Sequence, residues 1–285
     1  MNGQLFASAS DERQVLRLYR RGVGGEPVAS LDLSAFLGAR PREEADFEGG
    51  ARVGDLIFWI GSHGRKEDGR LEPGRRVLVA TAVRGEGLGA RLATKGRPFR
   101  GLIQAMAAEP SLAALDLGRA AGRPGEAPGG LNIEGLAAGP EGALWIAFRN
   151  PVPLGLALLV PLLNPGEAIE GRPARLGAPV RLDLGGLGIR DIARAGNRYL
   201  ILAGSAEGGG RHRLYVWTGG PGAPVEVVKA IPKSMGAEAI VVEDAVGVAL
   251  AELLDDDASR KIGGRRCDSL AIPGQRSFRA LDVGF

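Results

Sequence analysis

Acidic side chains recur at the start of four similar segments of this sequence. Glu48, Glu134 and Glu238 each stand in a short opening segment, and Asp191 occupies the corresponding place in another. If these segments are the inner strands of a repeat fold, the four carboxylates face one shared channel, where like charges repel each other. Such a cluster is tolerated when its acids are protonated, paired with arginine, or bound to a hard cation such as Ca²⁺ or Mg²⁺.

Basic side chains occur at matching positions beside these acids. His63 and Arg149 each lie fifteen residues after a glutamate, and Arg190 directly precedes the aspartate. One interpretation is structural, with each acid accepting hydrogen bonds from arginine or from backbone N–H groups. The other is a ligand pocket, and its candidate residues are Glu48, His63, Arg65, Glu134, Arg149, Asn150, Arg190, Asp191 and Glu238.

A divalent metal is a third interpretation, and its ligands would be Glu48, Glu134 and Glu238. Carboxylate oxygens suit Ca²⁺ or Mg²⁺, whereas two histidines and one cysteine without metal-ligand spacing argue against zinc. His63 leaves a strand into a glycine turn, where it is either a general base or a turn histidine bonded to the backbone. The second reading is favoured. His212 is expected to be a solvated loop residue.

Other catalytic motifs are missing from the sequence. The glycines of 85–89 lack the strand–loop–helix context of a dinucleotide site, and there is no Walker loop and no Gly-x-Ser-x-Gly elbow. Cys267 is predicted to be a core residue. Trp59 and Trp145 each follow a repeated glutamate by eleven residues, which indicates packing at one repeat position.

The elements that must position these residues repeat about every 50 residues. Each unit begins with an acid-bearing strand and continues with apolar runs, at 56–60, 77–80, 144–148, 156–163, 181–184, 199–202, 214–217 and 225–228. The fourth unit runs from 237–241 through 246 to 254. Four strands per unit are typical of a β-propeller blade.

The two ends of the chain are expected to close the ring. Residues 4–8, 15–19 and 28–33 read as three strands, and 277–283 completes the first or last blade. The sequence therefore predicts one all-β domain over 1–285, a β-propeller of about five blades, with six as the alternative count. Residues 102–117 have near-helical apolar spacing and predict a short helical insertion, followed by a surface loop.

Composition limits the classes of function. The net charge is +3, aromatic residues are 5% of the chain, and arginines are not interleaved with stacking residues, so nucleic-acid binding is not expected. No apolar run approaches the roughly 18 residues of a membrane helix. The first thirteen residues lack a signal-peptide core and the single cysteine cannot form an internal disulfide, so a cytoplasmic location is expected.

Several motifs together resemble a known bacterial family. The runs 59–65, 131–136, 144–151 and 188–192, followed by 254–256, Cys267 and Phe278-Arg279, are similar to the family called domain of unknown function 3616. The resemblance covers roughly residues 44 to 283. More distantly, the Glu-Gly strand start is similar to esterase-like-phytase and gluconolactonase propellers. In those, glutamates face a central channel and hold a divalent metal, a pattern from which Asp191 departs.

Two hypotheses about function follow. The first is a non-enzymatic propeller that binds a small molecule or a protein on an acidic and arginine-lined channel face. The second is a metal-assisted hydrolase of a phosphate ester or lactone, with the three glutamates around the cation. No membrane partner is expected.

Overall fold

The structure is a computed structural model. It describes residues 4–10, 13–40, 43–210, 212–220, 225–232, 234–242, 250–257, 260–270 and 278–285. Antiparallel β-sheets make up nearly all of its regular structure, and the helices are short. The expectation of an all-β chain is therefore confirmed.

The sheets follow the order of the chain. The first contains β1 (Leu5–Ala9), β2 (Val15–Arg20) and β3 (Ala29–Asp32). The second contains β4 (Phe47–Val53), β5 (Leu56–Gly61), β6 (Leu78–Arg84) and β7 (Arg91–Phe99). The third contains β8 (Asn132–Ala138), β9 (Leu144–Asn150), β10 (Ala157–Leu162) and β11 (Val180–Leu182). The fourth contains β12 (Gly188–Ala195), β13 (Arg198–Gly204), β14 (Arg213–Trp217) and β15 (Val225–Ala230). The fifth contains β16 (Ala237–Val242), β17 (Leu250–Asp255) and β20 (Ala280–Gly284).

The remaining elements are small. β18 (Lys261–Ile262) and β19 (Arg265–Arg266) form a two-stranded hairpin. The helices are α1 (Ser34–Leu37), α2 (Leu102–Ala108), α3 (Leu117–Ala120) and α4 (Pro165–Ile169). None of the helices in the described residues is long and apolar enough to cross a membrane.

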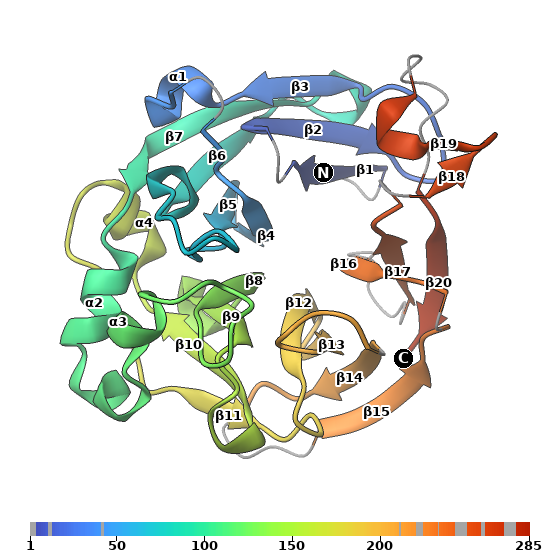
Figure 1. The fold of residues 1–285 in the computed structure, drawn as a ribbon. Helices are drawn as coiled ribbons and strands as arrows, with labels where there is room; N and C mark the ends of the chain where they lie inside the picture. Colours follow the sequence, from blue (N-terminus) through green and yellow to red (C-terminus); the bar gives the residue numbers. More distant parts are fainter. Residues whose placement is uncertain are drawn as a thin grey trace.

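The five larger sheets follow one another around a common centre, with the first strand of each sheet innermost (Figure 1). These first strands touch in chain order: β1 contacts β4, β4 contacts β8, β8 contacts β12, and β12 contacts β16. Between the fifth sheet and the first, Arg21 lies 4.0 Å from Glu252 of β17. Side chains of the innermost strands therefore have access to one shared central region.

The apolar core lies between consecutive sheets. One cluster of buried side chains joins the first and second sheets, another the second and third, a third the third and fourth, and a fourth the fourth and fifth. A strand such as β5 is thus covered on both faces and buries Ile57 through Gly61. This explains why the middle strands read as continuous apolar runs without strict alternation.

Most of the strands expected from the sequence are present, and the two tryptophans of the repeat are buried as predicted. Trp59 bonds Thr81 Oγ1 at 3.0 Å, and Trp145 bonds the hydroxyl of Tyr199 at 3.3 Å. The carboxyl-terminal strand β20 pairs with β17, which completes the last sheet.

Some elements differ from expectation. The insertion at 102–117 is helical but divided into α2, a 3-10 helix at Pro110–Leu115, and the start of α3. Pro110 cannot continue the hydrogen bonding of α2, which explains the break. Strand β7 was not predicted, because most of its residues are exposed and polar. Part of the expected fourth unit, 243–249, lies outside the described residues.

Candidate functional site

Four of the five innermost strands carry a β-bulge near their first residues. In β4, Phe47 pairs with Gly61 and Gly49 pairs with Ile60, so Glu48 is the extra residue. The pairings of β8, β12 and β16 skip one residue in the same way. The extra residues are Glu48, Glu134, Arg190 and Glu238. A bulge redirects the side chain of its extra residue, and here it marks the corresponding position in each sheet.

The bulge register corrects the repeat inferred from the sequence. Arg190, not Asp191, is the counterpart of the three glutamates. Asp191 lies one position further on, where the second and third sheets have Gly49 and Gly135. Its two oxygens accept backbone N–H groups, Oδ1 from Ile192 and Oδ2 from Ile240, both at 2.7 Å. Asp191 therefore joins β12 to β16.

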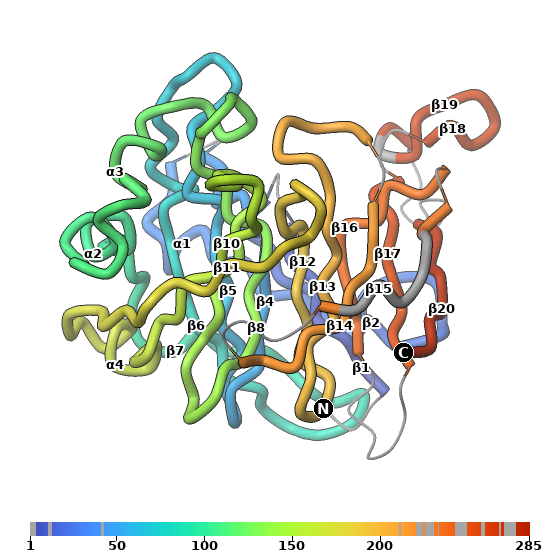
Figure 2. The backbone as a smooth tube through the Cα atoms, turned by 90° about the horizontal axis from the view of Figure 1, so that it is seen from below, coloured from blue at the N-terminus to red at the C-terminus, as the bar shows by residue number. Residues whose placement is uncertain are grey.

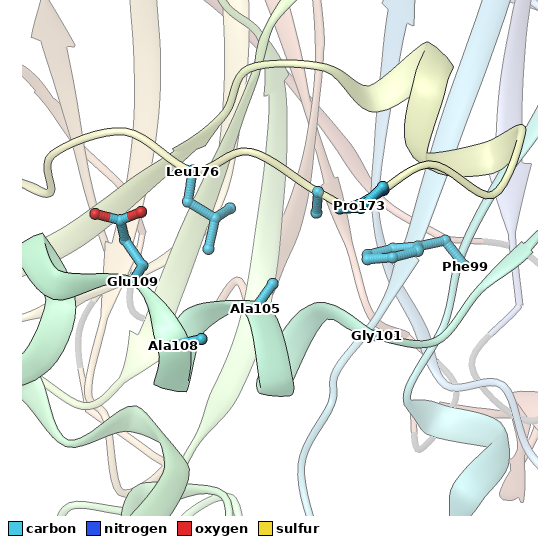
Figure 3. A pocket seen from close by; sticks show the side chains of 8 residues that line it. Phe99, Gly101, Ala105, Ala108, Glu109, Pro173 and Leu176 are labelled. Carbon is cyan, nitrogen blue, oxygen red and sulfur yellow. The ribbon is translucent and has the colours of Figure 1, made fainter.

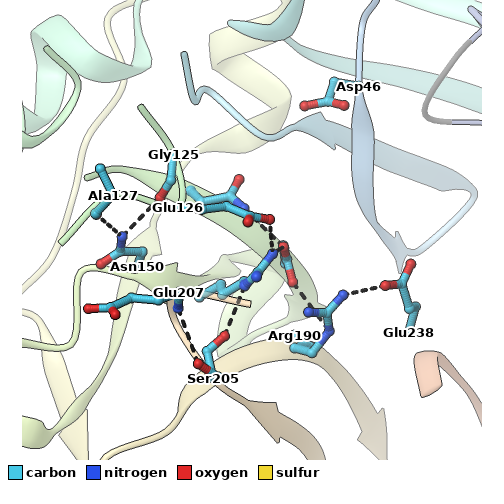
Figure 4. A network of polar contacts seen from close by, with 12 residues as sticks. Asp46, Gly125, Glu126, Ala127, Asn150, Arg190, Ser205, Glu207 and Glu238 are labelled. Atoms are coloured by element: carbon cyan, nitrogen blue, oxygen red, sulfur yellow. Dashed lines mark hydrogen bonds and ion pairs between the residues drawn. The ribbon is translucent and has the colours of Figure 1, made fainter. Parts of the chain in front are cut away.

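Glu134 and Arg149 form the centre of a polar network (Figure 4). Arg149 is unpaired in β9 as Glu134 is in β8, and its Nη1 donates to Glu134 Oε1 at 2.7 Å. The Glu134 side chain is 6% exposed and that of Arg149 5%. The same oxygen of Glu134 accepts a hydrogen bond from Asn132 Nδ2 at 2.9 Å. Arg149 Nε donates to the carbonyl of Ser205 at 3.0 Å.

Arg190 extends the network toward the fifth sheet. Its Nε lies 3.6 Å from Glu134 Oε2, and its Nη2 bonds Glu238 Oε1. In Figure 4 the Arg190 and Glu238 side chains point toward each other. The side chain of Arg190 is 12% exposed and that of Glu238 is 46% exposed. The network thus passes from a buried pair to an accessible carboxylate.

A loop after α3 brings a third acid to the network. Asn150 Nδ2 donates to the carbonyls of Gly125 and Ala127 at 2.9 and 2.7 Å. Between them, Glu126 Oε1 accepts from Arg149 Nη1 at 2.9 Å, and the Glu126 side chain is 61% exposed. Asn150, one of the sequence candidates, therefore positions this loop.

Burial sets the charge state of the inner acids. Desolvation raises the pKa of Glu134, opposed by Arg190 and then Arg149. Desolvation also raises the pKa of Asp191 to about 7, although the N–H groups of Ile240 and Ile192 act in the opposite direction. A buried carboxyl favours its neutral form unless charged partners compensate for lost hydration. At Glu134 the arginines offset part of this effect, and the pKa stays raised.

His63 and Arg65, like Asp191, are sequence candidates that bond to groups other than those of this network. His63 is fully buried, with a positive φ of 57°, and its Nδ1 bonds the carbonyl of Gly61 at 2.8 Å. Burial lowers its pKa to about 4. Arg65 bonds the carbonyls of Ala121 and Gly69 instead. The favoured reading of His63 as a turn histidine agrees with this geometry.

Three of the network residues were missed from the sequence. Glu126 stands in a Gly/Pro-rich loop with no repeat signal, and Ser205 takes part through its carbonyl. Asn132, the third, lies in a strand that was predicted. His212 also differs from expectation, because it is half-buried. The ring carbon Cδ2 of His212 and the side chain of Arg190 both lie beside Gly204. Burial, and then Arg190, lower the His212 pKa.

The three glutamates expected to hold a metal are not assembled for that purpose. Within the described ranges, no group of three or more His, Cys, Asp or Glu side chains could hold a metal ion. Glu134, the central member of the proposed set, uses its oxygens for Arg149, Asn132 and Arg190. The donor set therefore fits guanidinium groups better than a hard cation.

A groove of about 450 Å³ lies away from the network, between α2 and the segment before β11 (Figure 3). It is lined by Phe99, Gly101, Ala105, Ala108, Glu109, Pro173, Ala174 and Leu176. Its one acid, Glu109, accepts hydrogen bonds from the backbone N–H and hydroxyl of Ser111. The lining of the groove is mostly apolar, with Glu109 as its one ionisable side chain.

Comparison with solved structures finds remote likenesses. A protein of unknown function from Bacteroides caccae is 8% identical, with 87% of this chain and 81% of that chain covered, at a TM-score of 0.35. A bifunctional GH43-CE protein of Bacteroides eggerthii is 14% identical, with 74% of this chain and 31% of that chain covered, at a TM-score of 0.28. The similarities are too weak to bear on the function of this chain.

Sequence comparison is more informative about the family. No curated protein matches the chain. The family model described as protein of unknown function (DUF3616) matches residues 90–238, which is just over half of the sequence. The matched region includes the whole of the third and fourth sheets and with them Glu134, Arg149 and Arg190. The chain therefore belongs to the DUF3616 family of proteins of unknown function.

Proposed function

We propose that residues 1–285 form a single β-propeller of five blades, with each of the five larger sheets as one blade. Two observations support this proposal. The first strands of the sheets touch in chain order, and an apolar cluster lies between each consecutive pair of sheets from first to fifth. Blades packed face to face around an axis, with their first strands innermost, are the propeller arrangement.

We further propose that the chain binds a small polar ligand where the bulged first strands meet. The observation that carries this proposal is that exposed acids are bonded to charged side chains that are nearly buried. Glu126 and Glu238 are the accessible members, and each is bonded to an arginine that is nearly buried. Side chains held by buried partners lose little further freedom when a ligand arrives, so binding costs less entropy.

The charges of the network indicate the chemistry of the ligand. Glu126, Glu134 and Glu238 together outnumber Arg149 and Arg190 by one negative charge. Ionised carboxylates are acceptors only, so a complementary ligand must bring hydrogen-bond donors. A molecule carrying several hydroxyl or amino groups meets this requirement, and a partner protein would have to present such groups on a projecting side chain.

The metal-assisted hydrolase has less support. Its central ligand, Glu134, lies between two guanidinium groups. His63, one of the candidates for its base beside an acid, is fully buried with Nδ1 bonded to a carbonyl. No specific observation favours this alternative.

The binding proposal is tested by thermal unfolding of the purified chain against a panel of polyols, sugars, amino sugars and diamines. A compound that raises the melting temperature is then titrated by calorimetry into Glu126→Gln, Glu238→Gln and the control Glu86→Gln. Glu86 is an exposed acid in the loop before β7. We expect about tenfold weaker binding in the first two variants, equivalent to one lost charged hydrogen bond, and unchanged binding in the control.

Equal affinity in all three variants would place the ligand elsewhere. A stabilising effect of Ca²⁺ or Mg²⁺ that EDTA reverses, together with hydrolysis of an ester or phosphoester, would favour the hydrolase instead. If only proteins bind, with the same dependence on Glu126 and Glu238, the site serves a macromolecular partner.

A further inference from the structure

Two arginines from the segment between β5 and β6 converge on one carbonyl oxygen. Arg65 Nε donates to the carbonyl of Ala121 at 3.2 Å, and Arg76 Nη2 donates to the same carbonyl at 2.8 Å. Ala121 follows the last residue of α3. Because both guanidinium groups bond a single atom, their positive charges lie side by side.

Within the part of the chain that the structure describes, neither guanidinium group is paired with a carboxylate. The other hydrogen bond of Arg65 goes to the carbonyl of Gly69. The ion pairs of this segment involve its other cations: Lys66 and Arg75 pair with Glu44, Glu72 and Asp46, and Arg70 pairs with Asp68. The two adjacent charges are therefore left without a counter-ion from these residues.

The cost of this arrangement is evident at Arg76. Its Nε is buried and has no hydrogen-bond partner among the described residues. Burial, and then the charge of Arg65, lower the pKa of Arg76. Adjacent like charges and an unused buried donor both destabilise the site, and a bound anion would offset the repulsion between the two charges.

The surroundings strengthen the positive character of the site. His63 is kept neutral mainly by burial, and Arg76 and Arg100 add to the lowering of its pKa. Arg100 itself bonds the carbonyls of Pro73 and Leu37. These groups are all positive or neutral, so an approaching anion meets no repulsion from them.

We propose that Arg65 and Arg76 bind a small oxyanion, a phosphate or carboxylate group of a ligand, at the end of α3. A guanidinium presents its N–H donors in a planar fork that matches such groups, and the pair offers two forks. The carbonyl of Ala121 fixes the forks and leaves further donors on each side chain. This site is separate from the network around Glu134 and goes beyond the binding function proposed there.

One loop lies between the two sites. The backbone N–H of Gly125 donates to the carbonyl of Arg65 at 3.2 Å, and the next residue, Glu126, belongs to the central network. Figure 2 shows the segment after β5 and the loop after α3 side by side at one end of the molecule. One ligand with an anionic group and several hydroxyl groups could occupy both sites at once. Simple anions therefore test the site of Arg65 and Arg76 on its own.

The experiment is calorimetric titration of the full chain with inorganic phosphate at constant ionic strength, with acetate as a second arm and chloride as the blank. At a phosphate concentration ten times Kd, linkage predicts a rise in melting temperature of roughly 2–4 °C. If only phosphate binds, the ligand carries a phosphoryl group. If acetate binds equally well, the site accepts any oxyanion. We expect Arg65→Gln and Arg76→Gln each to weaken binding at least about tenfold.

Arg70→Gln is the matched control. Arg70 lies in the same segment, but its side chain is 63% exposed and paired with Asp68. Arg76→Lys keeps the charge without the fork and serves if the glutamine variant does not fold. The proposal fails if no anion binds, as expected of arginines that only cap the end of α3, or if binding survives both glutamine variants.

Discussion

Removing Arg149 tests whether the buried ionic centre holds the sheets together. Its Nη1 bonds Glu134 and Glu126, its Nε bonds the carbonyl of Ser205, and only 5% of its side chain is exposed. Arg149→Met keeps much of the apolar stem but leaves Glu134 with Asn132 and with Arg190, whose Nε lies 3.6 Å from Glu134 Oε2. Breaking one side of a buried pair costs about 3–5 kcal/mol, and we expect about 3 kcal/mol here because two partners remain.

The matching change in Glu134 gives a double-mutant cycle. Glu134→Gln leaves Arg149 with Glu126 and is expected to cost about 2 kcal/mol. The double variant leaves neither charge alone, so its cost falls short of the summed single costs by about 2 kcal/mol. Arg175→Met is the control, since Arg175 is 64% exposed and its ion pair with Glu167 lies at the surface, where such pairs contribute little to stability.

The assay is urea unfolding followed by fluorescence of the three buried tryptophans, at pH 5 and at pH 8. Without Arg149, the pKa of Glu134 rises further above its unfolded value, and the native state keeps a proton that the unfolded chain releases. The loss in Arg149→Met should therefore be larger at pH 8 than at pH 5. Additive costs in the cycle, or a loss as small as in Arg175→Met, would refute the reasoning.

Three further changes test other parts of the structure. Gly49→Ala puts a Cβ 2.9 Å from the backbone of the next sheet and should cost about 1–3 kcal/mol in urea unfolding, whereas Gly24→Ala meets nothing within 4 Å and should be near neutral. Because burial raises the pKa of Asp191 to about 7 from 3.8, its contribution to stability is lost as pH rises through that range. The melting temperature of Asp191→Asn should not fall in this way with pH. It should also be lower than that of the wild type throughout, since one amide oxygen cannot accept both backbone N–H groups. Burial lowers the pKa of His63 from 6.5 to about 4, so the wild type should lose up to about 3 kcal/mol as pH falls across this interval. His63→Asn, which tolerates the positive φ, should show a flatter pH profile, and an unchanged profile would contradict the buried neutral histidine.

The fifteen-residue spacing in the sequence has different outcomes in two sheets. Glu134 and Arg149 share this spacing and are bonded, because each is the unpaired residue of its own strand at the same place in the sheet. Glu48 and His63 share it as well, but the backbone of His63 turns at positive φ and its ring enters the protein interior. Equal spacing in sequence therefore does not give equal direction of the side chains.

The sequence by itself determined most of the strands and the order of the sheets. Apolar runs separated by glycine turns specify strands, and glutamate followed by tryptophan eleven residues later marks two corresponding units, because burial on both faces demands those residue types locally. Only the tertiary structure decided which charged residues meet. A bulge shifts register by one residue, so Arg190 replaces Asp191 in the network, and this shift depends on pairing with a neighbouring strand. Glu126 joins from a loop whose place against the sheet depends on another element, since Asn150 of β9 bonds two of its carbonyls.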